Sequence, residues 1–281
     1  MHAVPRTVIR DAVVLITGAA RGMGEIYARM AVAQGARAVA LWDVNGAAAE
    51  ALAAELDRGS CTVRAFVVDV SDLDDVRRGV AETRSQLGEV DVLINNAGIV
   101  TGGPFWEHDA TTDIERTMQV NAIAPMWLTH ELLPAMMGDR SRPKRILNIA
   151  SAAGTLANPN MSVYAASKWA LIGWGESLRL ELQQHGVTHL TVTTFCPSFV
   201  STGMFAGARG PLLTPIMTPR QATTAAWRGM LRGTPIVSKP WTVKLAMALR
   251  GVLPTRAWDA VAGRVFKVYA SMDAFTGHAG K

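Results

Sequence analysis

Residues 13–24, VVLITGAARGMG, join a short aliphatic run to a turn rich in glycine. The run from Val13 to Ile16 predicts a strand that is buried on both faces, as in a parallel sheet. A helical pattern follows and ends at Gln34-Gly35, and residues 37–42 predict a second strand that is closed by Asp43. This order of strand, turn, helix and strand is typical of a βαβ unit that binds a dinucleotide. The spacing Gly-x-x-x-Gly-x-Gly nevertheless differs from the usual Gly-x-Gly-x-x-Gly.

Strands and helices continue to alternate beyond this unit. Residues 66–70, 90–94 and 146–151 predict further strands, and residues 73–86 predict a helix. Such alternation predicts an α/β fold, a Rossmann-type doubly wound parallel sheet with helices on both faces.

Asp43 bears on the choice between NAD and NADP, because it closes the second strand about 20 residues after the glycine-rich turn. A carboxylate there accepts hydrogen bonds from the ribose hydroxyls and repels a 2′-phosphate, which favours NAD. Arg21, within the turn, favours NADP because a cation attracts a phosphate. Asp43 carries more weight, since a carboxylate beside a phosphate costs more than a flexible surface arginine contributes.

Polar residues stand at the ends of three later strands. Asp69 lies near the end of 66–70, Asn95 and Asn96 follow 90–94, and Ser151 closes 146–151. In open α/β sheets ligands bind beyond the carboxyl ends of the strands, so we expect these residues around one site. For the two asparagines an ordinary Asn/Gly turn is the alternative.

Tyr164 and Lys168 are four residues apart, about one helical turn, so both side chains project from one helix face. An ammonium beside a phenol favours the phenolate and lowers the pKa of the tyrosine. Such a tyrosine can exchange a proton with an alcohol or carbonyl oxygen, and Ser151 can donate to the same oxygen. A half-buried tyrosine one turn from a solvated lysine is the alternative, but the preceding motifs favour the catalytic interpretation.

Together these motifs resemble the short-chain dehydrogenase/reductase family over about residues 8–204, and residues 271–277 loosely resemble its retinol- and steroid-type branch. The matching residues are Thr17, Gly18, Gly22, Gly24, Asp69, Asn95, Asn96, Ala97, Gly98, Asn121, Ser151, Tyr164, Lys168 and Pro197. The catalytic residues that the resemblance implies are Asn121, Ser151, Tyr164 and Lys168. The cofactor-binding residues we predict are Gly18, Arg21, Gly22, Met23, Gly24, Asp43, Asp69, Val70, Asn95, Ala97, Gly98, Tyr164, Lys168, Pro197, Val200 and Thr202.

The resemblance also implies a role for each catalytic residue. The tyrosine is the acid/base, and the serine positions and polarises the substrate oxygen. The lysine holds the nicotinamide ribose and lowers the pKa of the tyrosine, and the asparagine orders a water between lysine and solvent. Pro197-Ser198 stands where the family usually has Pro-Gly, and Ser198 still offers a backbone N–H to the nicotinamide carboxamide.

Composition is that of a globular α/β protein. The chain has 281 residues, 49% of them hydrophobic, and two cysteines. No apolar run reaches the roughly 18 residues of a membrane span, and the run after Arg10 is too short for a signal peptide. We therefore expect a cytoplasmic protein. The histidines lack the spacing of metal ligands and no nucleic-acid motif appears, so neither a metal nor nucleic acid is expected.

The excess of basic over acidic residues is confined to the end of the chain. Residues 1–204 hold 17 Lys/Arg and 21 Asp/Glu, whereas residues 205–281 hold 11 and 2. We expect a single domain, 1–281, with a cofactor-binding and catalytic core over 8–204, and a substrate lid and basic helical extension over 205–281. Gly and Pro from Gly203 onward predict a mobile loop over the site. The predicted substrate pocket is Phe105, Trp106, Met204, Phe205 and Leu212, although these residues suit an ordinary core equally well.

Two helical patterns close the sequence, opened by Pro240 and Pro254. In the second, apolar residues from Trp258 to Met272 share one face, and Arg256, Arg264 and Lys267 lie opposite. A basic amphipathic helix can lie on an anionic membrane surface. We favour the alternative, in which it packs on a subunit or covers the pocket, because amphipathic helices mostly face a core.

The sequence thus predicts an NAD-dependent oxidoreductase that interconverts a secondary alcohol and its ketone, with an apolar and bulky substrate. An NADPH-dependent reductase of a carrier-bound 3-oxoacyl chain is the alternative, and Asp43 counts against it. A non-catalytic nucleotide-binding module is the third hypothesis, and the intact catalytic residues disfavour it. The family resemblance also implies a homo-oligomer, a dimer or a tetramer.

Overall fold

A computed structural model describes residues 8–57, 59–208, 210, 214–273 and 275–277. Seven parallel strands form one sheet in the order β3-β2-β1-β4-β5-β6-β7. The order reverses at β1, which pairs with both β2 and β4. Doubly wound sheets bind their ligands at such a reversal, so the predicted fold is confirmed.

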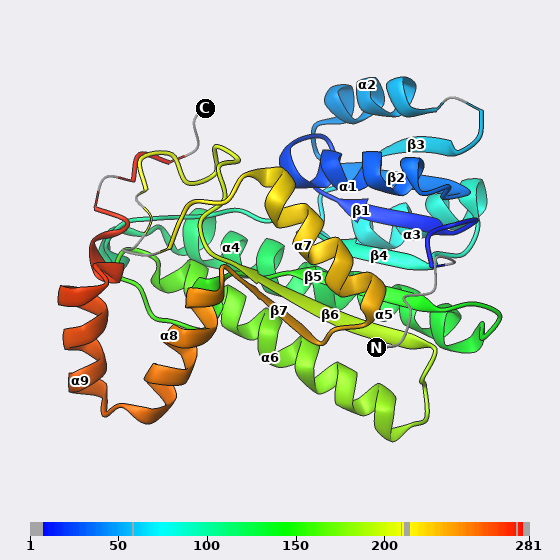
Figure 1. The fold of residues 1–281 in the computed structure, drawn as a ribbon. Coiled ribbons are helices and arrows are strands. Elements are labelled where there is room, and N and C mark those ends of the chain that lie inside the picture. Colours follow the sequence, from blue (N-terminus) through cyan, green and yellow to red (C-terminus); the bar gives the residue numbers. More distant parts are fainter. Residues whose placement is uncertain (1–7, 58, 209, 211–213, 274, 278–281) are drawn as a thin grey trace.

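Helices alternate with these strands along the chain (Figure 1). The strands are β1 (Val13–Thr17), β2 (Ala38–Asp43), β3 (Thr62–Val67), β4 (Val92–Asn95), β5 (Lys144–Ile149), β6 (Leu190–Pro197) and β7 (Ile236–Lys239). The α-helices are α1 (Gly22–Ala33), α2 (Gly46–Leu56), α3 (Leu73–Leu87), α4 (Arg116–Met118), α5 (Ala124–Gly138), α6 (Ser162–Gln184), α7 (Pro219–Arg232), α8 (Trp241–Val252) and α9 (Thr255–Ala260).

Both faces of the sheet are covered, which explains the continuous aliphatic run in β1. Val14 and Ile16 belong to the core shared with α1, α2 and α7, whereas Val13 and Leu15 belong to the core shared with α3, α5 and α6. Successive strand residues point to opposite faces, so a strand between two helical layers must be apolar throughout. Burial of each such side chain stabilises the fold by roughly 1.5–3 kcal/mol.

The predicted strand 66–70 is placed too late, since β3 ends at Val67. Asp69 lies in the turn that follows, where its carboxylate accepts the backbone N–H of Ser71 at 2.9 Å. The backbone N–H of Asp69 donates to the carboxylate of Asp75 at 2.8 Å. Side-chain carboxylates therefore accept the backbone N–H groups that a continuing strand would donate to its neighbour. The elements β6, β7 and α7 were not predicted from the sequence.

The predicted helix over the last residues is wrong as a single element. α9 ends at Ala260, a π-helical turn spans Val261–Val265, and Lys267 adopts a positive φ of 52°. The chain then folds back, so that the Tyr269 hydroxyl donates to the Asp259 carboxylate at 2.6 Å. Trp258, Ala262 and Met272 of this segment are buried against the body of the protein, whereas Val265 is exposed.

Within the described part of the chain, no helix combines the length and the apolar character that crossing a bilayer requires.

Candidate active site

The turn between β1 and α1 requires glycine at three positions. Gly18 and Gly22 each have a φ of 61°, a left-handed conformation that favours glycine. A Cβ on Gly24 would lie 2.1 Å from the carbonyl oxygen of Gly18. Gly24 therefore serves the close packing of helix and strand, while Gly22 and Met23 bring the amino end of α1 to the cleft. A helix amino end favours an anion such as a pyrophosphate.

Thr17 and Asn96 tie the end of β1 to the end of β4. The Thr17 hydroxyl accepts the backbone N–H groups of Asn96 and Ala97, both at 3.0 Å. The Asn96 side chain donates to the carbonyl oxygens of Thr17 and Gly18 at 2.9 and 3.0 Å. These bonds fix the two strand ends on either side of the cleft.

Asn95 does not face this cleft, contrary to the prediction. Its side chain is buried and donates to the Asn148 Oδ1 at 2.9 Å. Neighbouring residues of an extended segment point to opposite sides, so Asn95 enters the core while Asn96 lines the cleft.

Asp43 stands at the end of β2, where it was expected. Its two carboxylate oxygens accept the backbone N–H groups of Ala20 and Asn45, each at 2.9 Å. Asp43 and Arg21 both line the cleft, so the two residues that favour opposite cofactors share its rim.

A cleft of about 280 Å³ runs along the carboxyl ends of the central strands. Its lining includes most of the predicted cofactor residues, and among these only Gly24 and Asn95 are absent from it. The predicted residues that line it are Gly18, Arg21, Gly22, Met23, Asp43, Asp69, Val70, Ala97, Gly98, Tyr164, Lys168, Pro197, Val200 and Thr202. Asn96, which was expected near the site, also lines the cleft, and lining residues that were not predicted from the sequence include Trp42, Ile99, Arg116, Val120, Ile149 and Ala150.

Arg116 had no signal in the sequence. Its guanidinium pairs with the Asp69 carboxylate at 3.3 Å across 47 positions of the chain. Burial alone would raise the pKa of Asp69, but the bonds from Ser71 and the charge of Arg116 lower it. Only the folded chain brings these partners together.

Tyr164 and Lys168 lie in the first two turns of α6, and both are buried. The Lys168 ammonium lies 5.7 Å from the centroid of the Tyr164 ring and donates to the carbonyl oxygen of Ile149 at 3.0 Å. Ser151 follows β5, and its hydroxyl oxygen accepts the backbone N–H of Ala153 at 3.1 Å. Tyr164, Lys168 and Ser151 all line the cleft.

The pKa of Tyr164 does not follow the sequence expectation. Burial raises it to about 12, while a hydrogen bond with Ser151 acts in the opposite direction. Burial also lowers the pKa of Lys168 to about 8. Enclosure disfavours both charged forms, and this effect exceeds the expected stabilisation of the phenolate by the ammonium.

Asn121 sits on a π-helical turn, Gln119–Ile123, between α4 and α5. Its side chain donates to the Ile99 carbonyl at 2.8 Å and accepts the Ile99 N–H at 2.9 Å. A Cβ on Gly98 would lie 3.2 Å from the Asn121 Oδ1 and 3.5 Å from the Lys168 Nζ. Asn121 and Lys168 therefore converge on Gly98, and the π-turn is a feature frequent at functional sites.

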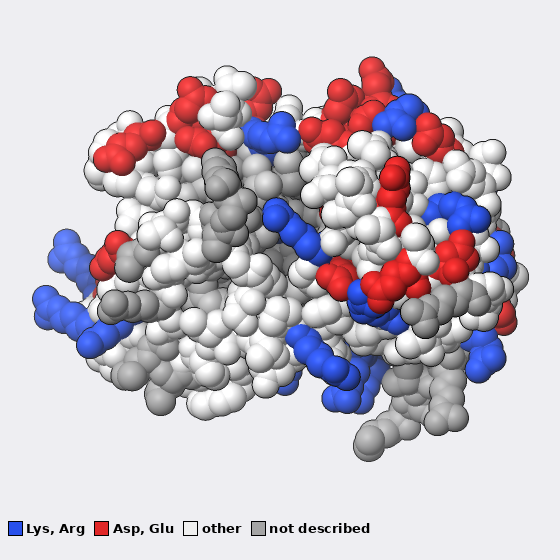
Figure 2. Space-filling model, turned by 90° about the horizontal axis from the view of Figure 1, so that it is seen from above, with Lys and Arg blue, Asp and Glu red and all other residues white. Residues whose placement is uncertain are grey.

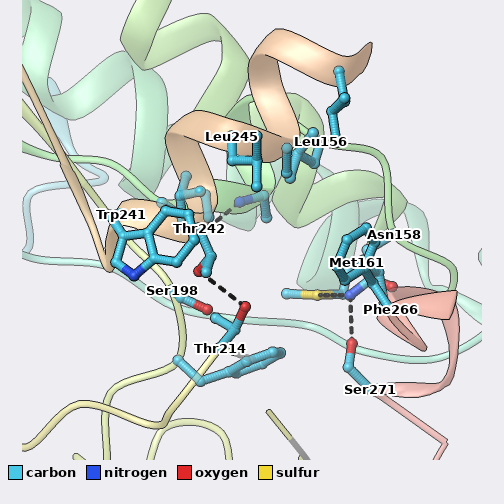
Figure 3. A pocket seen from close by; sticks show the side chains of 18 of the residues that line it. Leu156, Asn158, Met161, Ser198, Thr214, Trp241, Thr242, Leu245, Phe266 and Ser271 are labelled. Atoms are coloured by element: carbon cyan, nitrogen blue, oxygen red, sulfur yellow. Dashed lines mark hydrogen bonds between the residues drawn. The ribbon is translucent and has the colours of Figure 1, made fainter. Parts of the chain in front are cut away.

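A second cavity, of about 110 Å³, adjoins the cleft and shares Ser151, Ser198 and Phe205 with it. Its walls come from α8, from α9 and the segment after it, and from residues 151–161, 198–205 and Thr214, and they are largely apolar (Figure 3). Several polar side chains in it pair with one another, although the buried Asn158 Oδ1 has no hydrogen-bond partner among the described residues. Asn158 donates to the Ser271 hydroxyl at 2.9 Å, and the Thr214 and Thr242 hydroxyls are 3.1 Å apart.

Only part of the predicted substrate pocket lines these spaces. Met204 and Phe205 line the cleft, and the Phe205 ring meets the Tyr164 ring edge-on at a centroid distance of 5.7 Å. Phe105 and Trp106 are 56% and 84% exposed and line neither space, because their turn projects outward. Leu212 lies outside the described residues. The apolar lining on α8 was not predicted, whereas the segment after Pro254 was expected to pack on a subunit or to cover the pocket.

Over the described residues, no group of His, Cys, Asp or Glu side chains is arranged to hold a metal ion.

The model of the short chain dehydrogenase family matches residues 12–211. This chain belongs to that family. It is therefore an oxidoreductase of the short-chain dehydrogenase type, as the sequence motifs predicted. Two relatives are similar over nearly the whole chain. Estradiol 17-beta-dehydrogenase 11 of Homo sapiens is 32% identical over 275 residues, 97% of this chain and 88% of the relative. Epidermal retinol dehydrogenase 2 of Mus musculus is 33% identical over 277 residues, with the same coverage.

Two solved structures show the same fold. A short chain dehydrogenase/reductase from Burkholderia phymatum in complex with NAD has a TM-score of 0.78 and 25% identity, covering 86% of this chain and 94% of its own. A blue fluorescent protein from a metagenomic library in complex with NADPH has a TM-score of 0.73 and 29% identity, covering 83% and 98%. The family thus supports a nicotinamide cofactor here, and the tight glycine turn at the amino end of α1 and the lack of a side chain at Gly98 in the cleft lining fit one.

Proposed function

We propose that this short-chain dehydrogenase interconverts a bulky, apolar secondary alcohol and its ketone, with NAD as cofactor. One observation carries the proposal: the cofactor cleft and the apolar cavity meet at Ser151, beside the buried Tyr164. A substrate held in the cavity can therefore place its oxygen at these two hydroxyl groups.

The lining of the cavity supports an apolar substrate. Phe205, Leu245 and Trp258 belong to its walls. Four of its polar side chains are paired with one another, Asn158 with Ser271 and Thr214 with Thr242. Such a lining favours aliphatic or ring surface over a polyol, because each sugar hydroxyl would need a partner of its own. The similarity to proteins named for estradiol and retinol agrees with this class.

The catalytic residues act on one oxygen. In the oxidising direction Tyr164 as phenolate removes the hydroxyl proton, and in the reducing direction its phenol returns that proton to the carbonyl oxygen. Ser151 donates to the same oxygen and orients it. Lys168 provides positive charge near the phenolate, and Asn121 holds the Ile99 backbone beside Lys168.

The cofactor would lie along the cleft, with its phosphates at Gly22 and Met23 and its adenosine ribose at Asp43. A nicotinamide cofactor supplies the hydride acceptor or donor when bound. Asp43 supports NAD, because its carboxylate lines the cleft and its charge would repel a 2′-phosphate. A preference for NADPH would instead favour the reductase of a carrier-bound 3-oxoacyl chain.

The first test compares wild type with Tyr164→Phe on a panel of lipophilic secondary alcohols, following absorbance of the reduced cofactor. We expect the variant to lose at least about a hundredfold in kcat, with an unchanged Kd for NAD. Activity restricted to small polar polyols, or undiminished in the variant, would contradict the proposal.

The second test measures the Kd of NAD and NADP by tryptophan fluorescence. We expect NAD to bind at least about tenfold more tightly, and Asp43→Ser to reduce that ratio. Asp57→Ser, which removes an acidic residue after α2 and outside the cleft, is the control and should leave the ratio unchanged.

A further inference from the structure

The helix α8 carries apolar residues on two faces, and only one of these faces packs against the rest of the protein. Val243, Ala246 and Leu249 face the cavity and the neighbouring Trp258. Trp241, Leu245, Ala248 and Val252 follow at spacings of four, three and four, so they share one stripe of the helix. All four are exposed, Trp241 by 68% and Val252 by 83%. We call these four residues the α8 stripe.

The α8 stripe is continuous with the mouth of the apolar cavity. Trp241 and Leu245 both line the cavity and are exposed at the surface (Figure 3). The cavity therefore opens beside the stripe. An apolar molecule that crossed this opening would remain in contact with apolar side chains throughout.

Positive charge surrounds this part of the molecule. Residues 239–273 contain six Lys/Arg and two Asp/Glu, and one of these acids, Asp259, accepts a hydrogen bond from Tyr269. Lys244 flanks the stripe on α8 itself and is exposed. In Figure 2 lysine and arginine side chains project from the end of the molecule that α9 occupies in Figure 1.

We propose that the α8 stripe docks on an anionic lipid surface and receives the substrate from it through the cavity mouth. The proposal rests on the proposed function for the nature of the substrate. Exposed tryptophan and aliphatic side chains enter the boundary of headgroups and acyl chains, and the surrounding Lys and Arg are attracted to anionic headgroups. A second copy of this chain is a poorer occupant, because symmetric contact would bring two basic surfaces together.

Vesicle sedimentation of the whole protein tests the surface without reference to catalysis. We expect binding to phosphatidylcholine vesicles that contain phosphatidylserine, weaker binding to phosphatidylcholine alone, and release by salt. Val252 and Ala248 lie on the α8 stripe and outside the cavity lining. The variants Val252→Glu and Ala248→Glu should each weaken vesicle binding about tenfold. Leu180→Glu, on an exposed α6 position (54%), is the matched control and should bind as wild type.

Site-specific labelling gives an independent readout. Cys61 and Cys196 are both buried, so a cysteine introduced by Val252→Cys can carry an environment-sensitive fluorophore alone. We expect its emission to shift to the blue with anionic vesicles, and the emission of a label at Leu180→Cys to stay unchanged. Absence of vesicle binding, or binding of the stripe variants equal to that of wild type, would overturn the proposal. An emission shift that depends on protein concentration and needs no vesicles would also overturn it, because a second copy of the chain would then cover the α8 stripe.

Activity then separates the two proposals. With a water-miscible secondary alcohol and no vesicles, Val252→Glu should match the wild type, whereas with a vesicle-dissolved alcohol its KM should rise. Vesicle binding in a protein without dehydrogenase activity would reject the proposed function and retain the docking surface.

Discussion

Tyr164 and Lys168 show how burial competes with charge pairing at a single site. The burial of both groups raises the pKa of the phenol to about 12 and lowers the pKa of the ammonium to about 8. One pKa unit corresponds to roughly 1.4 kcal/mol, so the enclosed site disfavours either charge by a few kcal/mol. Ser151 works against this shift by bonding to the phenol oxygen.

Lys168 should make the stability of the protein rise with pH. Its pKa is about 8 when folded and 10.5 when unfolded, so the folded chain gives up the proton first. The unfolded chain then binds more protons between these values, and the free energy of unfolding increases across that window. We expect wild type to gain up to about 3 kcal/mol relative to Lys168→Met between pH 8 and pH 10.5, as an upper bound. Urea unfolding at a series of pH values measures this difference.

The control for that experiment is Lys244→Met, because this lysine is exposed on α8. Its difference from wild type should stay flat over the same pH range. A flat difference for Lys168→Met as well would show that this ammonium is not desolvated.

At the scale of elements, the turn from β1 to α1 depends on a contact between backbones. Gly24→Ala places a methyl group 2.1 Å from the carbonyl oxygen of Gly18, so helix and strand must separate. We expect a loss of at least about 2 kcal/mol in the free energy of unfolding, together with weaker NAD binding. Gly173→Ala is the control, since a Cβ at this α6 position meets nothing within 4 Å and should be neutral or stabilising. Chemical denaturation and NAD titration of both variants check the expectation.

A second element-scale contact joins α8 to the loop that carries Ser151. The Arg250 guanidinium donates to the Thr155 carbonyl at 2.6 Å and lies 4.5 Å from the centroid of the Trp169 ring. The Trp169 indole in turn donates to the Ala153 carbonyl at 2.8 Å. Arg250 is thus a positioning residue that holds the cavity wall against the loop after Ser151.

Arg250→Gln should therefore loosen the cavity and leave the chemistry in place. We expect the KM for a bulky alcohol to rise about fivefold, while kcat and the Kd of NAD stay within about twofold. Steady-state kinetics measure this split, with Arg256→Gln on α9 as the control that should change neither constant. An equal loss of kcat on small and bulky substrates would contradict the role of Arg250.

Across the whole molecule, the cofactor cleft and the substrate cavity come from different parts of the chain. Residues up to Phe205 line the cleft, whereas α8 and the segment from Trp258 to Ser271 supply much of the cavity. The two spaces share Ser151, Ser198 and Phe205. For this reason, substitutions in α8 or in the segment from Trp258 to Ser271 should alter substrate binding and leave cofactor binding unchanged.

Leu249→Trp tests this separation. The larger side chain would fill the cavity of about 110 Å³ from α8 without reaching the cleft. We expect the KM for bulky alcohols to rise at least about tenfold, because overpacking excludes the substrate, with the Kd of NAD unchanged. Thr255→Val, an exposed position of α9, is the control. A parallel loss of NAD binding would show that the two spaces are not independent.

The sequence by itself determined the doubly wound fold, the glycine-rich turn and the positions of Ser151, Tyr164 and Lys168. These features follow from local patterns: aliphatic runs at strand spacing, glycines where side chains do not fit, and one helical turn between two residues. Asp43 was placed correctly for the same reason, because the end of a strand is readable from its own residues.

Only the tertiary structure decided which way Asn95 and Asn96 point, that Arg116 pairs with Asp69, and that the segment after α9 folds back over the cavity. It also decided that Phe105 and Trp106 lie outside the pocket and that α8 supplies its wall. The burial of Tyr164 and Lys168, and hence the direction of their pKa shifts, belongs to this group too. Each depends on residues distant in the chain, and a local pattern contains no information about which distant surface will exclude water from a side chain.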